Sequence, residues 1–414
     1  MNTLSNNAAR FLYFVGKPYP QTDFLQTIRQ SGYKIGIFQD KNIKLKNHDL
    51  FDSVITCDFS TTERLLEGLD PALPIAGLLC TYENYVVPKS VLGTFFAVPS
   101  SDIAAAIKCT DKLLMRQAFL DKDPDITPKF GLVASLDDAL SVSRTLHYPL
   151  ILKPTNLVKS LLVMKCETEA DLNRNFKDAA TRIGQLYKKY HVYGRQPRFI
   201  LEEFVTGTMC SIAAFVDERG TPHFCEGIVG LATARDRGKQ DSYLYSRTLP
   251  TELSKELSNE LFAVAGTGIS ALGMKSTPAH VELMYNDAGV KLIEIGARIG
   301  GYRPRMYKYS YGVDLLSAEI TLAVGEAPNL AGSFMAYSAV FELFPDRDGA
   351  FVSLSGADDT TKYEYFSLKA KPGKKVGPAK DGYKACAVVI VTSTNPKQFR
   401  DICGSVDNIR VNLS

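Results

Sequence analysis

Residues 279–298 read AHVELMYNDAGVKLIEIGAR, and this stretch is the most informative in the chain. Two apolar runs flank the turn sequence NDAG (286–289), so the pattern predicts an antiparallel hairpin. Glu282 and Glu294 then lie at a similar depth on the two strands and face each other. Two close carboxylates repel unless a cation lies between them, and Mg²⁺ prefers oxygen ligands. Solvated glutamates on an exposed hairpin face fit the same pattern equally well.

Composition excludes several other classes of protein. With 45% hydrophobic and 22% charged residues over 414 positions, the chain is predicted to fold into two or three domains rather than to be disordered. A formal charge of +3 argues against nucleic-acid or membrane-surface binding by bulk electrostatics. The eight cysteines form no C-x-x-C pair, and the sequence has no apolar run of the roughly 18 residues that a membrane span requires. We therefore expect a soluble cytoplasmic protein with buried, unpaired cysteines.

The first hundred residues predict a mainly parallel α/β sheet. Short apolar runs alternate there with helix-length amphipathic stretches, and the expected strands are residues 11–15, 33–38, 54–57 and 75–80. The sequence VPSSD (98–102) has turn and N-cap chemistry, which indicates a first boundary nearby. The later part mixes helices with antiparallel strands, so the predicted fold class is α/β followed by α+β.

Two lysines and one arginine are candidates for binding an anion. Lys153 ends the apolar run PLILKP, where an ammonium group is costly unless an anion meets it. Lys112 lies at the start of a predicted helix and is the same kind of candidate, whereas lysines that merely reach solvent are the alternative for both. Arg298 follows Glu294 by four residues and suits phosphate or carboxylate.

Five motifs in order resemble the ATP-grasp ligases over about residues 109–328. They are DK-x-x-MR (111–116), PLILKP (149–154), ILEEFV-x-G (200–207), HVE (280–282) and EIGARIGG (294–301). The segment YSYGVDLLSAEITLAVGEAP (309–328) is most similar to amino-acid ligases that make dipeptides, the relatives of bacterial dipeptide synthetases and carnosine synthase. The resemblance implies a Rossmann-like domain preceding the grasp (1–108), a two-lobed ATP-grasp domain (109–328) and a C-terminal ligase subdomain (329–414).

The resemblance also implies roles for individual residues. Lys112 and Lys153 would neutralise the ATP phosphates, Glu282 and Glu294 would hold Mg²⁺ or Mn²⁺, and Arg298 would stabilise charge on the transferred phosphoryl group. The segment that offers main-chain groups to adenine would be Glu202, Glu203, Phe204 and Val205.

The implied reaction is ADP-forming ligation of a small carboxylate to a small amine through an acyl-phosphate. A carboxylase, a purine-pathway type of ligase and a non-catalytic nucleotide-binding relative are the alternatives. A homodimer is the base-rate expectation for the assembly.

Three positions depart from the family pattern. The flap over the phosphates, TNLVKSLLVMK (155–165), has no glycine, and Lys159 and Ser160 would replace the usual backbone cradle with side-chain contacts. Met209 stands where a ribose-binding acid is expected, and Gly296 stands where the family has a metal-binding asparagine. We therefore expect any metal ion to rely on the two glutamates, phosphate and water.

Further polar residues flank the central motifs. Arg303 and Arg305 follow the diglycine, and they would either clamp a substrate carboxylate or form a solvated basic surface. His280 lies two residues before Glu282, and a packed strand histidine is the favoured interpretation over a ligand or base.

Overall fold

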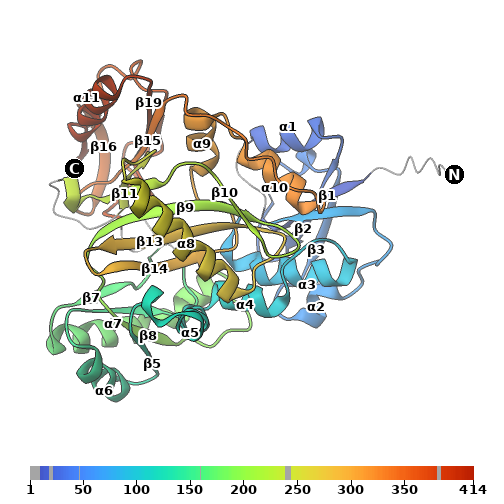
Figure 1. Cartoon of the computed structure of the whole chain (residues 1–414), viewed down its shortest axis with the longest axis horizontal. Helices are drawn as coiled ribbons and strands as arrows, with labels where there is room; N and C mark the ends of the chain where they lie inside the picture. The colour runs from blue at the N-terminus through green and yellow to red at the C-terminus, as the bar shows by residue number, and fades with distance from the viewer. Residues whose placement is uncertain (1–9, 18–21, 46, 159, 238–243, 380–383) are drawn as a thin grey trace.

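The computed structural model describes residues 10–17, 22–45, 47–158, 160–237, 244–379 and 384–414. The N-terminal part is a parallel four-stranded sheet in the order β3-β2-β1-β4, which confirms the predicted α/β layer (Figure 1). The strands alternate with helices, as a parallel sheet requires. The elements are β1 (Phe11–Gly16), α1 (Thr22–Gln30), β2 (Lys34–Asp40), η1 (His48–Leu50), β3 (Ser53–Cys57), α2 (Thr62–Leu66), β4 (Ile75–Leu79), η2 (Glu83–Tyr85) and α3 (Val86–Phe96).

Helix α10 comes from the second half of the chain and packs on this N-terminal sheet. Leu316, Ile320 and Ala323 join the apolar cluster of β1 and β2. A Cβ at Gly77 of β4 would lie only 2.2 Å from the carbonyl oxygen of Ala323, so the close approach requires glycine. The segment 309–328 therefore contributes to the first domain. It holds the end of α9 (Arg303–Tyr311) and the whole of α10 (Leu315–Ala323), and Gly312, which adopts a left-handed conformation, ends α9 between them.

A small antiparallel sheet in the order β5-β8-β6-β7 forms a separate lobe at the bottom of Figure 1. Helices α6 and α7 supply the apolar faces that complete the core of this lobe. Helices α4 and α5 connect it to the N-terminal domain. The bounds are α4 (Ile103–Thr110), α5 (Lys112–Lys122), η3 (Pro124–Ile126), β5 (Phe130–Val133), α6 (Leu136–Leu146), β6 (Leu150–Pro154), β7 (Met164–Cys166), α7 (Glu169–Lys189) and β8 (Phe199–Glu203).

The largest sheet has nine strands in the order β14-β13-β9-β11-β12-β15-β19-β17, with β10 paired to β9. Its first two strands are the predicted hairpin, and helix α8 packs on them. The bounds are β9 (Thr208–Val216), β10 (Pro222–Phe224), β11 (Val229–Thr233), η4 (Arg235–Arg237), β12 (Leu244–Leu249), α8 (Lys255–Leu272), β13 (Thr277–Asn286), β14 (Gly289–Gly296), β15 (Tyr337–Leu343), β17 (Tyr365–Leu368) and β19 (Ala387–Ser393).

The C-terminal segment extends this large sheet through β15, β17 and β19. Strands β16 (Gly349–Ser355), β18 (Lys375–Val376) and β20 (Arg410–Leu413) form a further small sheet, and α11 (Pro396–Asp407) packs on β19. The sheet is thus continuous from β12 to β15, across residue 328. The division at residues 108 and 328 remains a proposal.

All eight cysteines are buried and unpaired, as predicted. No helix among the described residues is both long enough and apolar enough to span a membrane.

Candidate active site

The two glutamates of the hairpin lie directly opposite each other, as predicted. Glu282 of β13 pairs in register with Glu294 of β14, and a bulge follows at Glu282/Leu283. Oε1 of Glu282 lies 3.2 Å from Nε2 of His280. Burial raises the pKa of Glu282, but the hydrogen bond from His280 and the charges of Arg303 and Arg298 outweigh it and bring the pKa to about 2. The Glu282 carboxylate is therefore ionised throughout the physiological pH range.

Lys112 connects Glu294 to the flap. Its Nζ atom donates to Oε1 of Glu294 at 3.1 Å and to the main-chain oxygen of Leu157 at 3.1 Å. Burial lowers the pKa of Lys112, yet Glu294 and the neighbouring acids raise it by more. Asp111 places this lysine at the first turn of α5, because its carboxylate caps the N–H groups of Leu113 and Leu114. The ammonium group is therefore held at the two glutamates.

Lys153 belongs to a buried three-residue ion network. Its Nζ atom lies 2.8 Å from Oε2 of Glu202, and Arg116 contacts the same carboxylate at 2.8 and 3.2 Å. Burial raises the pKa of Glu202, but the two cations lower it by more. The net shift is downward, so the carboxylate stays charged. Two cations share one anion here, and the network therefore retains an excess positive charge that suits a phosphate oxygen.

Arg298 is held by an acid from the N-terminal domain. Its Nε atom donates to Oε2 of Glu83 at 2.9 Å. The substitution of the family asparagine by Gly296 makes room for this contact, because a Cβ at Gly296 would lie 3.1 Å from Oε2 of Glu83. Burial and the nearby charge of Glu294 raise the pKa of Glu83, whereas Arg298 lowers it; the net shift is upward. Oε1 of Glu83 is buried without a hydrogen-bond partner among the described residues.

These residues fit a divalent hard cation through carboxylate oxygens. Glu282 and Glu294 are adjacent across the ladder, and each is only partly buried, with 25% and 33% of the side chain exposed. Within the described ranges no group of three or more His, Cys, Asp or Glu forms a complete metal cage. A pair of carboxylates is a donor set that suits Mg²⁺, because this ion keeps several water ligands and takes further oxygen ligands from substrate phosphates.

The segment predicted to contact adenine spans the end of β8 in the small lobe. The N–H groups of Glu203 and Phe204 are already used, since they donate to the carbonyl oxygens of Lys129 and Pro149. Lys165 lies 3.9 Å above the Phe204 ring. The side chain of Glu202 is committed to the buried ion network, and its main chain lies in an inner strand of the sheet, paired with Phe130 of β5 and Ile151 of β6. The adenine role of this segment remains a prediction.

The flap is anchored by leucines rather than loosened by glycines. Leu157, Leu161 and Leu162 are buried in the core of the small lobe. Ser160 and Leu162 both adopt positive φ angles, +53° and +56°, where side chains are strained. Ser160 is exposed. Lys159 lies outside the described residues, so its predicted phosphate contact, like that of Ser160, remains a prediction.

Arg303 and Arg305 have different environments. Arg303 is only 2% exposed, and its Nη2 atom donates to Oγ of Ser211 at 2.7 Å. Ser211 of β9 is the residue that pairs with Glu282 of β13, so Arg303 binds the strand neighbour of Glu282. Arg305 instead stacks on the Tyr365 ring at 4.4 Å. The two guanidinium groups therefore serve different neighbours in this structure, and a substrate clamp by either one remains a prediction.

Sequence reasoning missed four contributors to this site. They are Glu83, Arg116, Leu157 and Ser211, and each contacts a predicted residue. Arg116 lies in the DK-x-x-MR motif, so its place in that motif was the available signal. Glu83 is 215 positions from Arg298, and no local pattern joins the two. His280 is 8% exposed, as expected of a packed strand histidine, and it also contacts Glu282.

Comparison with known proteins identifies the family. Residues 146–304, which hold the hairpin and the small lobe from β6 to β8, match the ATP-grasp domain. The chain therefore contains an ATP-grasp domain. This confirms the family expected from the five motifs. An alanine–anticapsin ligase from Bacillus subtilis is 24% identical over 329 residues, which are 73% of this chain and 66% of that protein. The chain spans 57% of the length of another curated relative, from Sinorhizobium fredii.

Solved structures confirm the ATP-grasp fold over the whole chain. An L-amino acid ligase from Bacillus licheniformis superposes with a TM-score of 0.79 at 16% identity and covers 98% of this chain and 99% of its own. A phosphoribosylglycinamide synthetase from Anaerococcus prevotii has a TM-score of 0.69 at 17% identity and covers 98% of this chain and 100% of its own. At these identities the likeness concerns the fold.

Proposed function

We propose that the protein is an ATP-dependent, ADP-forming ligase that joins the carboxylate of an amino acid or related acid to an amine. The observation that supports it best is the convergence of Lys112, Glu294, Glu282 and Arg298 at one place, next to the network of Lys153. An array of this kind suits phosphoryl transfer, which depends on positioning and charge neutralisation more than on a protein nucleophile.

The proposed reaction consists of two transfers. The substrate carboxylate oxygen forms a bond to the γ-phosphorus of ATP while the bond to the β–γ bridging oxygen breaks, giving ADP and an acyl-phosphate. The amine nitrogen then attacks the acyl carbon, and phosphate leaves with loss of a proton. Lys112 and Lys153 would bind phosphate oxygens, and Arg298, oriented by Glu83, would face the charge that develops on the transferred group. Glu282 and Glu294 would hold Mg²⁺, which supplies charge neutralisation when it is bound.

Two alternatives remain of interest. The fold is shared with a purine-pathway type of synthetase, and a carboxylase-type reaction would use the same nucleotide site. A non-catalytic role is favoured by Gly296 and Met209, which replace residues that the family pattern leads us to expect. Against this stands the retention of both lysines, both glutamates and Arg298, and the excess positive charge of the network around Lys153, where two cations share Glu202. A cytoplasmic location and a homodimer are expectations that accompany the proposal.

The test is ADP release from Mg-ATP with pooled amino acids. We expect release to require an acid together with an amine, and to fall by about 100-fold or more in Glu294→Gln, because the amide has lost the negative charge that a metal ion needs. Glu218→Gln, an exposed change at the β9–β10 turn, is the matched control and should retain full activity.

Direct metal binding adds a second readout. Mn²⁺ titration followed by electron paramagnetic resonance should show weaker binding in Glu294→Gln than in Glu218→Gln. Full turnover by Glu294→Gln would contradict the metal role. ADP release that requires bicarbonate and no amine would favour the carboxylase instead.

A further inference from the structure

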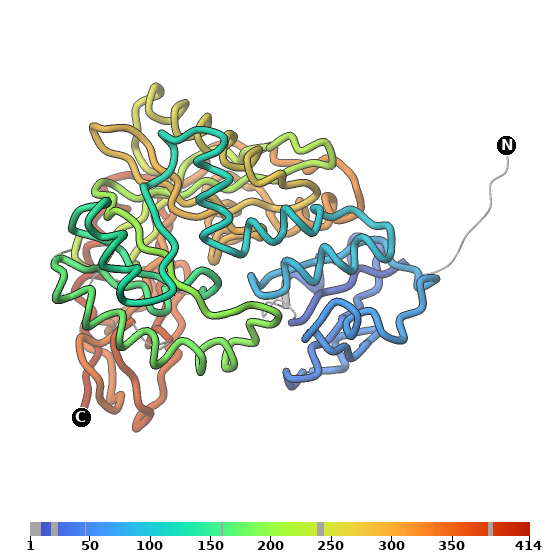
Figure 2. Tube along the Cα trace, turned by 90° about the horizontal axis from the view of Figure 1, so that it is seen from below, coloured from blue at the N-terminus to red at the C-terminus, as the bar shows by residue number. Residues whose placement is uncertain are grey.

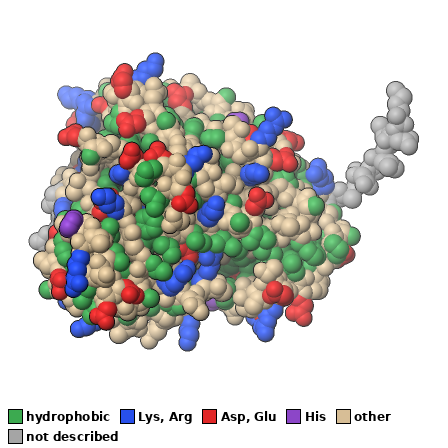
Figure 3. All heavy atoms as spheres, turned by 60° about the horizontal axis from the view of Figure 1, so that its bottom comes forward, with side chains coloured by type: hydrophobic (Ala, Val, Ile, Leu, Met, Phe, Trp, Pro, Cys, Tyr) green, Lys and Arg blue, Asp and Glu red, His purple; other side chains and the backbone are tan. Residues whose placement is uncertain are grey.

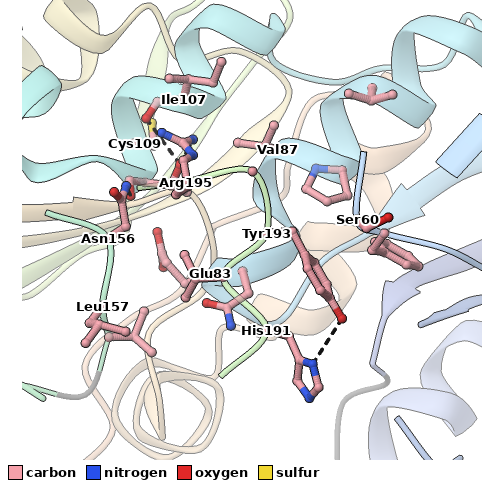
Figure 4. Close-up of a pocket in the computed structure, with 18 of the residues that line it drawn as sticks. Ser60, Glu83, Val87, Ile107, Cys109, Asn156, Leu157, His191, Tyr193 and Arg195 are labelled. Atoms are coloured by element: carbon pink, nitrogen blue, oxygen red, sulfur yellow. Dashed lines mark hydrogen bonds between the residues drawn. The ribbon is translucent and has the colours of Figure 1, made fainter. Parts of the chain in front are cut away.

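A cavity of about 440 Å³ lies between the N-terminal domain, helix α4, the start of the flap and the loop after α7. This volume falls in the range of roughly 300–1,000 Å³ that is typical of small-molecule sites. Figure 4 shows the lining side chains, with Asn156 and Leu157 on one side, Ser60 on the other and Glu83 between them. Figure 3 shows hydrophobic side chains gathered around a hollow on this side of the molecule.

The cavity is continuous with the candidate active site. Lys112, Glu294 and Glu83 are among its lining residues. Lys112 and Glu294 form the ion pair at the proposed phosphate and metal position, and Glu83 holds Arg298. A molecule in the cavity would therefore have one polar end at the place where the proposed phosphoryl transfer occurs.

The walls away from this polar end are mainly apolar. Their apolar side chains come from the N-terminal domain and from α4, and the polar Ser60, Thr61, Thr62 and Asn84 lie among them. The apolar residues are Phe59, Leu65, Val87, Pro88, Val91 and Ile107. Phe59, Leu65 and Val91 are buried at 4%, 3% and 4% exposure and belong to a packed core, so these walls are rigid. An apolar group of the substrate would gain free energy by leaving water here.

The apolar walls offer no partner to a charged group. Charged side chains of the lining lie in ion pairs elsewhere in the cavity: Glu83 with Arg298, Lys112 with Glu294, and Arg195, which shares Asp111 with Arg198. A charge buried against Phe59, Leu65 and Val91 would lack a partner and would cost free energy. The part of the ligand that meets these walls is therefore uncharged.

A loop of the small lobe closes the cavity. Residues 190–195 extend from the end of α7 to the N-terminal domain, and the green segment in Figure 2 reaches toward the blue domain. The main-chain oxygen of Tyr190 accepts a hydrogen bond from Asn84, and the hydroxyl of Tyr193 donates to Asp40 at 3.1 Å. The loop thus makes the cavity a site built from both domains.

We propose that this cavity receives the side chain of an amino acid substrate and selects large, uncharged, mainly apolar side chains. The inference rests on the proposed ligase function and names its substrate class. The polar end of the cavity would bind the reacting carboxylate of the amino acid, and the apolar walls would contact its side chain.

The test narrows the cavity and measures binding directly. L-Phenylalanine, L-leucine, glycine and L-glutamate are titrated calorimetrically into the protein with Mg²⁺ and a non-hydrolysable ATP analogue. We expect phenylalanine or leucine to bind at least about tenfold more tightly than glycine or glutamate, and Val87→Phe to weaken that binding by about tenfold or more through loss of space. Binding of the nucleotide analogue should change by less than about twofold, since Val87 is not among the residues proposed to bind ATP.

Two further variants make the outcome decisive. Val352→Phe introduces the same side chain at a 47% exposed position of β16 and should leave all affinities unchanged. Ile107→Phe narrows the cavity from α4 and replaces Val87→Phe if that variant unfolds. Equal binding of glycine and phenylalanine, or full phenylalanine affinity in a folded cavity variant, would overturn the proposal. Binding is measured without turnover, so the two proposals can fail separately. Selective binding of phenylalanine or leucine by a protein that releases no ADP would contradict the ligase function and leave the proposal for the cavity intact.

Discussion

At the scale of single residues, we expect Lys153 to make the proposed binding of ATP dependent on pH. Burial lowers the pKa of this lysine to about 8, although Glu202 opposes the shift. The ammonium group is positive below that pKa and neutral above it, so affinity for the ATP phosphates should be highest below pH 8 and fall as the pH rises through 8. Nucleotide titrations between pH 6.5 and 9.5 measure this.

The control for this prediction is Lys153→Arg. A guanidinium keeps its charge over the whole range, so the fall in affinity above pH 8 should disappear in this variant. The same pH dependence in both proteins would assign the titration to another group.

Arg116 is a buried ion pair partner whose loss should destabilise the fold. It is 1% exposed and contacts both the Glu202 carboxylate and the main-chain oxygen of Ile293. Arg116→Met removes one cation from a buried anion, and we expect a loss of about 3 kcal/mol in the free energy of unfolding, measured with urea. Arg174→Met breaks the pair with Asp171 on α7, where the arginine side chain is 70% exposed, and should cost less than about 1 kcal/mol. Equal losses would mean that Arg116 contributes no more than a surface pair.

At the scale of elements, the loop after α7 acts as a strap from the small lobe to the N-terminal domain. Asp40, which is fully buried at the end of β2, accepts hydrogen bonds from Tyr85 and Tyr193. Tyr193→Phe removes one of these donors. We expect destabilisation of about 1–2 kcal/mol and faster amide hydrogen exchange confined to residues 190–195.

The matched control is Tyr33→Phe in the N-terminal domain, which should leave exchange in the loop unchanged. Unchanged exchange in Tyr193→Phe would show that the loop is held by its other contacts, such as Arg195 with Thr110.

At the scale of the whole molecule, the Glu83–Arg298 ion pair couples the N-terminal domain to the hairpin. Glu83→Gln keeps the size of the side chain and removes its charge. If Glu83 orients Arg298, kcat should fall by about tenfold while the KM for ATP stays nearly constant, because the lysines proposed to contact ATP are unaltered. Steady-state kinetics with ADP release check this, and Glu67→Gln at an exposed position is the control. A proportional rise in the KM for ATP would indicate a general loss of structure.

The sequence by itself determined the local elements and the order of the motifs. The alternation of apolar residues fixed the parallel strands near the N-terminus, and the turn at 286–289 set the hairpin. These features depend on neighbours a few residues apart, whose spacing is visible in one dimension. The bulge between Glu282 and Leu283, which the sequence did not predict, shifts the register by one residue and brings Glu282 opposite Glu294. Helix α3 was not predicted, because it is apolar on several sides and has no amphipathic period.

Only the tertiary structure decided which distant side chains complete the site. Glu83 reaches Arg298 because Gly296 leaves space for it, and Glu202 is held by Arg116 rather than facing a ligand. The cavity is formed by segments around residues 59–65, 83–91, 107–112, 156–158 and 191–195. Contacts of this kind depend on how layers pack, and packing joins positions that no linear spacing relates.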